Sequence, residues 1–202
     1  MSAVFDPDAA LMLRVKQGDT AAFAELVDKY KRPVMNLVYR MIHDLTEAED
    51  IAQNVFVQVY KSADRYKVAS KFSTWLFTIA RNLCLNEIRR RSRHPTESMD
   101  VTPSEPEERP AQQYEDKVNP LATQAVLQTE LAQKIDEAIA ELPENQRMAL
   151  LLCRQDELSY EEIAKILDCT LSATKSLIHR GRETLKEKLK PYLRTGVWKE
   201  PG

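Results

Sequence analysis

The amino-acid sequence predicts an all-α protein in which a flexible, acidic, Pro-rich linker joins two small helical domains. Apolar residues recur at helical spacing along most of the 202-residue chain, whereas the alternating pattern of β-strands is scarce. Glycine occurs only four times. Proline is concentrated, because five of the ten prolines lie in residues 95–120, where apolar periodicity is almost absent. We therefore expect domains over residues 8–94 and 122–193, with residues 95–121 as the linker.

The N-terminal domain is expected to contain four helices. They span residues 8–17, 20–43, 46–62 and 72–93. Gly18 ends the first helix, and Pro33 is expected to kink the second helix, which carries a long apolar stripe. Thr46 and Glu49 form a capping-box pattern, which places the start of the third helix. A polar, basic loop over residues 64–71 precedes the fourth helix.

The C-terminal domain is expected to begin with two helices, over residues 121–142 and 144–155. Pro143 stops the first of them, and the second contains the apolar run MALLLC, which is expected to be buried. Pro191 is expected to end the last helix of the domain, and the residues from 195 onward are expected to form a frayed tail.

Residues 158–189, LSYEEIAKILDCTLSATKSLIHRGRETLKEKL, predict two helices joined by a tight turn. Ser159 and Glu162 form a capping box, Asp168 tolerates a left-handed backbone in the turn, and Thr170 suits the N-cap of the next helix. Five polar or basic side chains are expected to face outward on that second helix: Lys175, Ser176, His179, Arg180 and Arg182. This arrangement is typical of a helix-turn-helix that binds the DNA major groove. The alternative is an ordinary helical hairpin with a solvated basic face.

The net charge of −2 conceals two basic blocks in an otherwise acidic chain. Residues 61–93 contain nine Lys or Arg against two acids, and residues 175–194 contain seven against two. Two separate basic blocks indicate two surfaces for a polyanion.

Several classes of protein are excluded by the sequence. No apolar run is long enough to span a membrane, and the N-terminus has no signal-peptide pattern, so we expect a cytoplasmic protein without membrane insertion. Cys84, Cys153 and Cys169 lack metal-ligand spacing, which favours reduced thiols in the protein interior and predicts no metal or cofactor. The chain has no paired acids in a motif and no Gly-rich phosphate loop, so no enzymatic activity is expected.

The fourth helix has an unusual polar side. Its hydroxyl, amide and guanidinium side chains recur every four residues, at Thr74, Thr78, Asn82, Asn86 and Arg90. Such groups can hydrogen-bond base edges, while arginines contact phosphates. Phe72 and Trp75 lie at the start of this helix beside the basic loop, where rings can stack on single-stranded bases. We expect Phe72 in the core; for Trp75 the core and DNA interpretations remain equal.

The third helix carries apolar residues on more than one side. Ile51, Ala52, Val55 and Val59 form an ordinary buried face, whereas Phe56, Val57 and Tyr60 lie elsewhere on the circumference. A helix of this kind either lies centrally in the core or takes part in a protein interface, and its composition does not separate the two alternatives.

Taken in order, these blocks resemble the extracytoplasmic-function group of bacterial sigma factors. The blocks are EDIAQNVFVQVY, a basic loop, FSTWLFTIARN with an Arg run, the Pro-rich linker, and a helix-turn-helix introduced by LPENQR. The resemblance covers roughly 170 of the 202 residues. It implies a protein that binds core RNA polymerase, directs it to promoters and helps to open the duplex, and that an anti-sigma factor holds inactive.

The resemblance also implies three groups of site residues. Core polymerase would be bound by Asp50, Gln53, Asn54, Phe56, Val57 and Tyr60. The −10 element, as an opened strand, would be bound by Lys71, Ser73, Trp75, Thr78, Arg81, Asn82, Asn86, Arg89 and Arg90. The −35 element, as duplex, would be bound by Lys175, Ser176, His179, Arg180 and Arg182. Asn54, the Leu171–Ala173 helix entry and Leu177 depart from the residues frequent in the family.

The competing interpretation is a stand-alone helix-turn-helix regulator of transcription. Such a protein would need a dimer surface or a sensory domain, and the N-terminal half of the sequence shows no pattern for either. A regulator would bind promoter duplex strongly by itself, whereas a sigma factor would bind it poorly without polymerase.

Overall fold

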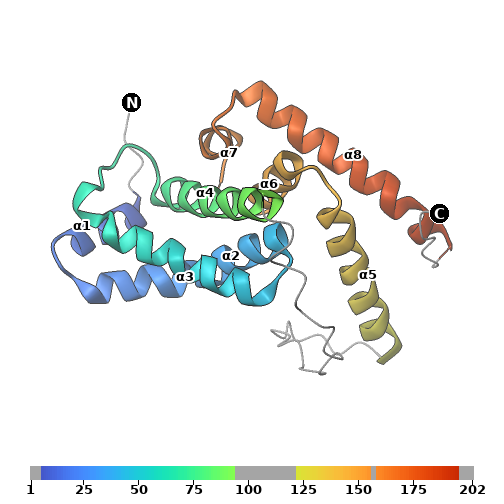
Figure 1. Cartoon of the computed structure of the whole chain (residues 1–202), viewed down its shortest axis with the longest axis horizontal. Coiled ribbons are helices and arrows are strands. Elements are labelled where there is room, and N and C mark those ends of the chain that lie inside the picture. The colour runs from blue at the N-terminus through green and yellow to red at the C-terminus, as the bar shows by residue number, and fades with distance from the viewer. Residues whose placement is uncertain (1–5, 94–121, 156–157, 196–202) are drawn as a thin grey trace.

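The computed structural model describes residues 6–93, 122–155 and 158–195, and Figure 1 shows their arrangement. These residues form eight α-helices and one short 3-10 helix, with no strand among them, so the prediction of an all-α fold is confirmed. The N-terminal half contains α1 (Pro7–Lys16), α2 (Thr20–Ile42), α3 (Leu45–Lys61), η1 (Ala63–Arg65) and α4 (Phe72–Arg93). The C-terminal half contains α5 (Ala122–Ala140), α6 (Glu144–Cys153), α7 (Tyr160–Leu167) and α8 (Leu171–Thr195). The predicted linker lies outside the described residues.

Helix α2 is the centre of the N-terminal half. It packs against α1, α3 and α4, and its apolar stripe lies in the core, with Leu26, Val34 and Leu37 each no more than 1% exposed. The helix continues through Pro33. Tyr30 of the same stripe donates a hydrogen bond to the buried Asp8 carboxylate at 2.5 Å, which joins α2 to α1. Burial of this apolar stripe stabilises this half of the chain.

The start of α3 corrects one prediction. The N-cap is Asp44, whose carboxylate accepts a hydrogen bond from the Glu47 backbone amide at 2.9 Å, so the predicted Thr46–Glu49 capping box is wrong. A carboxylate satisfies an otherwise unpaired amide of the first turn at least as well as a hydroxyl does. His43, with φ of 57°, ends α2 immediately before this cap. The turn between α2 and α3 is therefore only two residues long.

The helix-turn-helix forms as predicted. Ser159 and Glu162 make a reciprocal capping box, with bonds of 2.7 and 3.2 Å. Asp168 has a left-handed backbone with φ of 52°. The Thr170 hydroxyl accepts a hydrogen bond from the Ala173 amide at 3.1 Å, which confirms Thr170 as a cap for α8.

The end of α8 differs from the prediction. The helix continues through Pro191 to Thr195, so the expectation that Pro191 ends it is wrong. A proline inside a helix removes one backbone hydrogen bond, and packing of the following turn offsets the loss. Tyr192 supplies that packing, because it is only 8% exposed.

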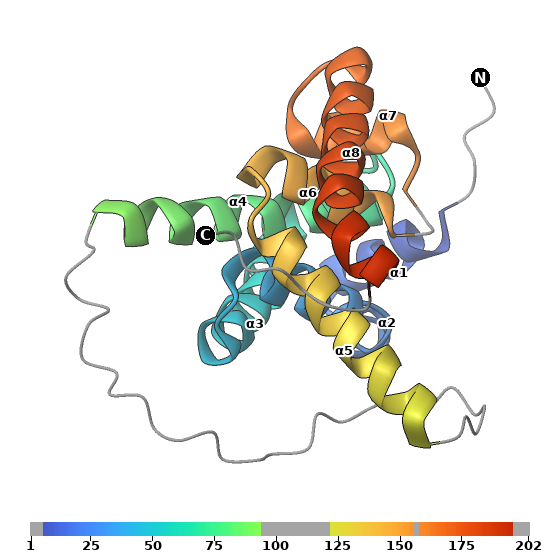
Figure 2. The same cartoon turned by 90° about the vertical axis from the view of Figure 1, so that its right-hand side faces the viewer.

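The two halves of the chain pack directly against each other. α2 contacts α5 and α6, and α4 contacts α7, so the buried apolar residues of both halves form one continuous cluster. Figure 2 shows α6 above α2, with which it is in contact. The Arg147 guanidinium of α6 donates hydrogen bonds to the carbonyls of Leu142 at 3.0 Å and Met41 at 3.1 Å. Arg40 of α2 forms an ion pair with Asp136 of α5 at 3.2 Å.

Candidate polymerase and nucleic-acid interfaces

The outer side of α3 presents apolar and polar side chains together. Ala52, Val55 and Val59 are buried, which turns the opposite side of the helix to solvent. That exposed side carries five of the six predicted polymerase contacts: Asp50, Gln53, Asn54, Val57 and Tyr60. Val57 and Tyr60 are 43% and 50% exposed, although both are large apolar side chains. This side of α3 therefore resembles an interface more than a solvated helix face, which favours that alternative for the third helix.

Phe56, the sixth predicted polymerase contact, lies apart from the others because it is half-buried against the core cluster. Tyr60 contacts the Phe23 ring of α2, with ring centroids 5.1 Å apart, so its exposed ring is held in place. A fixed, half-exposed aromatic ring can enter a partner pocket at little cost in side-chain entropy.

An aromatic cluster fixes the beginning of α4. Phe72 is 1% exposed, which confirms the prediction that it belongs to the core. The ring of Trp75 lies 5.0 Å from Tyr66 and 6.0 Å from Phe72, centroid to centroid. Burial raises the pKa of Tyr66 to about 12, so this ring stays neutral. Trp75 is half-buried, which leaves part of its ring open to a stacked base.

The polar side of α4 is buried near the start of the helix and exposed near its end. Ser73 and Thr74 are each 3% exposed, and the half-buried Thr78 donates its hydroxyl to the Thr74 carbonyl at 2.7 Å. Asn82 and Asn86, farther along the helix, are exposed. In this arrangement Ser73, a predicted −10 contact, has no surface available for DNA. The exposed polar groups lie in the C-terminal half of α4.

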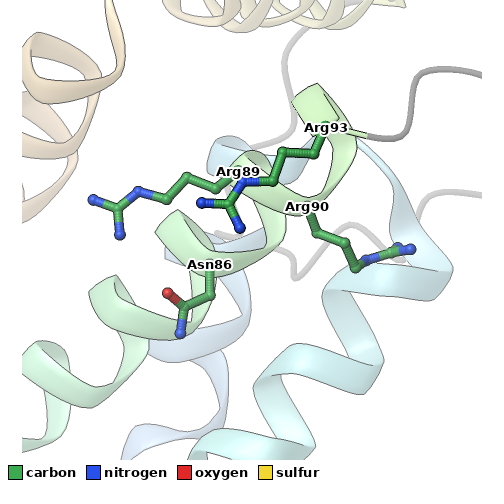
Figure 3. A pocket seen from close by; sticks show the side chains of 4 residues that line it. All are labelled: Asn86, Arg89, Arg90 and Arg93. Carbon is green, nitrogen blue, oxygen red and sulfur yellow. The ribbon is translucent and has the colours of Figure 1, made fainter.

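A basic hollow of about 310 Å³ lies beside that half, lined by Asn86, Arg89, Arg90 and Arg93. Figure 3 shows Arg89 and Arg90 pointing to opposite sides of α4. Arg90 forms ion pairs with Glu87 at 2.8 Å and Glu47 at 3.1 Å. Arg89 and Arg93 form no ion pair with any residue that the structure describes. Among the lining arginines, Arg89 and Arg93 are therefore the ones whose charges remain available to phosphate.

Arg91 has a structural role, which its position in a run of arginines does not indicate. It forms ion pairs with Glu47 and Glu87 and donates a hydrogen bond to the Ile42 carbonyl at 3.0 Å. Burial opposes its charge, but hydrogen bonds to Glu47 outweigh burial and raise the pKa of Arg91. The side chain thereby joins the end of α4 to the turn between α2 and α3.

The second basic surface lies on α8. All five predicted −35 contacts are exposed, namely Lys175, Ser176, His179, Arg180 and Arg182. On the opposite side Thr174 and Ile178 are 0% and 2% exposed, as expected for the inner face of a helix-turn-helix. An open hollow of about 610 Å³ lies over the first turns of α8, lined by Leu171, Ser172, Lys175, Ser176 and His179. The N-terminal part of a recognition helix is the part that contacts base edges.

The chain is similar to known proteins over most of its length. Residues 26–94 match the family model for Sigma-70 region 2, and residues 132–185 match the model for Sigma-70 region 4. The chain is 40% identical to the ECF RNA polymerase sigma factor SigW of Bacillus subtilis, over 88% of this chain and 94% of that protein. It is 37% identical to the ECF RNA polymerase sigma-E factor of Escherichia coli K12, over 93% and 96%.

The chain belongs to the extracytoplasmic-function group of RNA polymerase sigma factors.

Two solved structures share the fold of this sigma factor. CnrH, in complex with the cytosolic domain of CnrY, superposes with a TM-score of 0.67 at 20% identity, over 92% of this chain and 99% of that chain. RpoE of Bartonella quintana, in complex with the anti-sigma factor NepR, has a TM-score of 0.64 at 26% identity, over 83% and 96%. Region 2 of this sigma factor includes α3 and α4, and region 4 includes the helix-turn-helix.

Neither a membrane-spanning helix nor a cluster of metal-binding side chains is found in the part of the chain that the structure describes. None of their helices combines the length and apolarity needed to cross a membrane. They contain no group of three or more His, Cys, Asp or Glu side chains that could hold a metal ion. Of the three thiols, Cys84 is buried, and burial raises its pKa to about 12, whereas Cys153 and Cys169 are half-buried.

Three residues that position these surfaces were not predicted from the sequence. Asp6 caps both α1 and α4, and the Asp-Pro pair at residues 6–7 is a helix-start signal that could have identified it. Gly181 lies where α8 crosses α6, and a glycine inside a strong helical pattern is a sign of close packing. Arg147 binds carbonyls of both halves, and no local sequence signal indicates that contact.

Proposed function

We propose that three surfaces of this sigma factor bind three different partners. Helix α3 binds core RNA polymerase, α4 binds the opened −10 strand and α8 binds the −35 duplex. The proposal follows the predicted boundaries, with residues 8–94 as the domain for polymerase and −10 binding, residues 95–121 as linker and residues 122–193 as the −35 domain. The observation that carries it is the exposure of the predicted contacts on α3, α8 and the C-terminal half of α4.

The α3 surface suits a protein partner. Val57 and Tyr60 supply apolar area, and Asp50, Gln53 and Asn54 surround it with hydrogen-bonding groups. An apolar centre with a polar rim is the usual composition of an interface core.

The α4 surface suits an opened strand. Asn82 and Asn86 offer amides to base edges, Arg89 offers a charge to phosphate, and Trp75 offers part of a ring for stacking. The α8 surface suits duplex DNA, because its basic side chains lie on the side opposite the buried Thr174 and Ile178.

The sigma factor acts without chemistry of its own or a cofactor, in the cytoplasm, and an anti-sigma factor holds it inactive. Bartonella quintana RpoE, which shares the fold and 26% identity, was solved with the anti-sigma factor NepR, and this supports an inhibitory partner here. Purification from the native host tests this point: an associated anti-sigma protein is expected, and repeated isolation without one would contradict it.

Run-off transcription on genomic fragments tests the proposal as a whole. Core polymerase with this protein is expected to give discrete transcripts, whereas the protein alone is expected to bind the same promoter duplexes poorly. Strong, specific duplex binding by the protein alone, without transcripts from the reconstituted polymerase, would favour the stand-alone helix-turn-helix regulator instead. Promoters mapped in this way supply the −10 and −35 sequences for the experiments below.

A further inference from the structure

We propose that Leu171 is a specificity-determining residue of this sigma factor, and that it selects a thymine in the −35 element by contacting the C5-methyl group of that base in the major groove. The inference rests on the −35 function proposed for α8, and it adds one residue and one base to that function. The five −35 contacts predicted from the sequence are polar or charged side chains, whereas the contact proposed here is apolar.

Leu171 lies on the surface of α8 that is proposed to meet DNA. It is the first residue of the helix, and it lines the hollow over the first turns of α8. The other side chains that line this hollow are polar: Ser172, Lys175, Ser176 and His179. Figure 1 shows these first turns at the top of the molecule, away from α1, α2 and α3. An apolar side chain is therefore placed among groups suited to base edges, in the part of a recognition helix that contacts them.

Packing inside the protein does not account for this leucine. Leu171 is half-buried, but among the residues that the structure describes it does not pack against the buried apolar cluster. Leu177 of the same helix is also half-buried, and it does pack against that cluster. The inner face of α8 is formed by Thr174 and Ile178, which are 0% and 2% exposed. The apolar surface of Leu171 is thus available to an apolar group of a ligand.

Hydrogen bonds on both sides of Leu171 fix the start of α8. The Thr170 hydroxyl accepts a hydrogen bond from the Ala173 amide at 3.1 Å, and the buried Thr174 hydroxyl donates to the Thr170 carbonyl at 3.1 Å. The Cys169 thiol lies 3.2 Å from the Thr174 hydroxyl oxygen. The backbone of Leu171 is therefore held in place before DNA binds. A contact residue that is positioned in advance loses little conformational entropy on binding.

Thymine is the base that matches this side of α8. In the major groove it presents a C5-methyl group together with the O4 acceptor, and the other three bases of DNA have no methyl group there. Lys175 follows Leu171 by four residues, so the two side chains are neighbours on one side of the helix. Its ammonium group can donate to O4 while Leu171 contacts the methyl group. Guanine also offers acceptors to a lysine, so the discrimination in favour of thymine comes from Leu171.

Replacement of dT by dU tests this contact, because it removes the methyl group and keeps both O4 and the base pairing. Core polymerase reconstituted with the full chain is bound to a mapped promoter in which each thymine of the −35 element, on either strand, is replaced in turn. Burial of one such carbon group corresponds to about fourfold in affinity. We expect one thymine at which dU weakens promoter binding about fourfold, and changes of less than about twofold at the others.

Two leucine variants assign the effect to a residue. Leu171→Ala is expected to bind the dT and dU promoters within about twofold of each other at the sensitive position. Leu177→Ala is the matched control, because it makes the same change in a half-buried leucine of the same helix that packs against the core. It is expected to keep the preference of about fourfold for dT. The ratio of the two affinities is measured within one preparation, so a loss of folded protein in either variant cancels.

Three results would overturn the role of Leu171: no thymine that is sensitive to dU in the wild type, equal sensitivity in Leu171→Ala, or loss of the preference in Leu177→Ala as well. Replacement of the whole −35 element by an unrelated sequence separates this inference from the proposed function. If that replacement weakens promoter binding while dU does not, the −35 function of α8 stands and the role of Leu171 falls. If that replacement leaves promoter binding unchanged, the −35 function itself falls.

Discussion

The Asp6 carboxylate accepts a hydrogen bond from the Phe72 backbone amide at 2.7 Å, although the two residues lie 66 positions apart in the chain. Its other oxygen accepts from the Asp8 amide at 3.0 Å, so one side chain caps α1 and α4 together. The helix proposed to bind the −10 strand is thus anchored at its start by the first described residue of the chain.

Replacing Asp6 is expected to destabilise region 2 more than replacing an ordinary cap. Asp6→Ala removes acceptors from two helix starts and is expected to lower the free energy of unfolding by about 2 kcal/mol. Asp44→Ala, which removes a cap from α3 alone, is expected to cost about 1 kcal/mol. Urea denaturation of both variants checks the order, and an equal cost for the two would contradict the double cap.

Gly181 is expected to tolerate no side chain. A Cβ there would lie 2.7 Å from Leu150 Cδ1 of α6, so Gly181→Ala forces the buried Leu150 side chain to shift within the α6–α8 contact. We expect a loss of about 1–3 kcal/mol in the free energy of unfolding. The double variant Gly181→Ala with Leu150→Ala should cost less than the sum of the two single variants, because the added methyl occupies space that the leucine vacates. Strict additivity would argue against this contact.

Acid is expected to loosen the end of α4. The Arg90 hydrogen bond to Glu87 is the largest influence that lowers the pKa of this carboxylate below 4.5, and it outweighs the opposing effect of burial. A lowered folded-state pKa stabilises the fold above pH 4.5, and this stabilisation is lost as pH falls through the folded-state value. Urea midpoints measured between about pH 7 and pH 3 should therefore decline less steeply in Glu87→Gln than in wild type. An identical decline would show that Glu87 makes no contribution.

Neighbouring arginines of α4 are expected to separate into functional and structural ones. Arg89→Ala should leave the free energy of unfolding within about 0.5 kcal/mol of wild type and reduce open-complex formation about tenfold, because it removes an available cation. Arg91→Ala should lower the free energy of unfolding by about 1–3 kcal/mol, since it breaks bonds to Glu47, Glu87 and the Ile42 carbonyl. Permanganate footprinting and urea denaturation measure the two effects. Similar stability losses in both variants would refute the distinction.

The exposed apolar surface of α3 is expected to control assembly with polymerase. Val57→Asp should weaken binding to core RNA polymerase about tenfold, because it places a charge in the centre of the proposed interface. Leu13→Asp is the matched control, since Leu13 of α1 is 41% exposed against 43% for Val57. Native gel titration with core polymerase compares them, and equal weakening by both variants would leave α3 without a special role.

Local chemistry was sufficient to predict most of this fold. The Ser159–Glu162 capping box, the left-handed Asp168 and the buried run MALLL all depend on neighbours within a few residues, and the structure contains each of them, with Cys153 at the end of the predicted MALLLC run half-buried. The errors also have local causes. Thr46 and Asp44 both lie near the start of α3, and the sequence shows two possible caps without showing which amide each one meets.

The contacts of α4 could not be predicted in the same way, because they involve residues that lie far away in the sequence. Four-residue spacing indicated one polar side from Thr74 to Arg90, but burial divides that side, and Arg90 turns to Glu47 of another helix. Arg81 is similar, because its guanidinium binds a backbone carbonyl of α7, and a carbonyl gives no signal in a sequence. Exposed functional groups on one helix could therefore be proposed from spacing, whereas their ion-pair partners required the fold.

Arg147 couples the unfolding of one half of the chain to that of the other. Its guanidinium binds carbonyls of Leu142 in its own half and of Met41 in the other, within a continuous apolar cluster. Melting of the N-terminal half would therefore leave the half-buried Arg147 cation of the C-terminal half without its Met41 acceptor, at a cost of about 1–3 kcal/mol. A calorimetric scan of the full chain should therefore show one cooperative transition, and two resolved transitions would contradict this coupling between the halves.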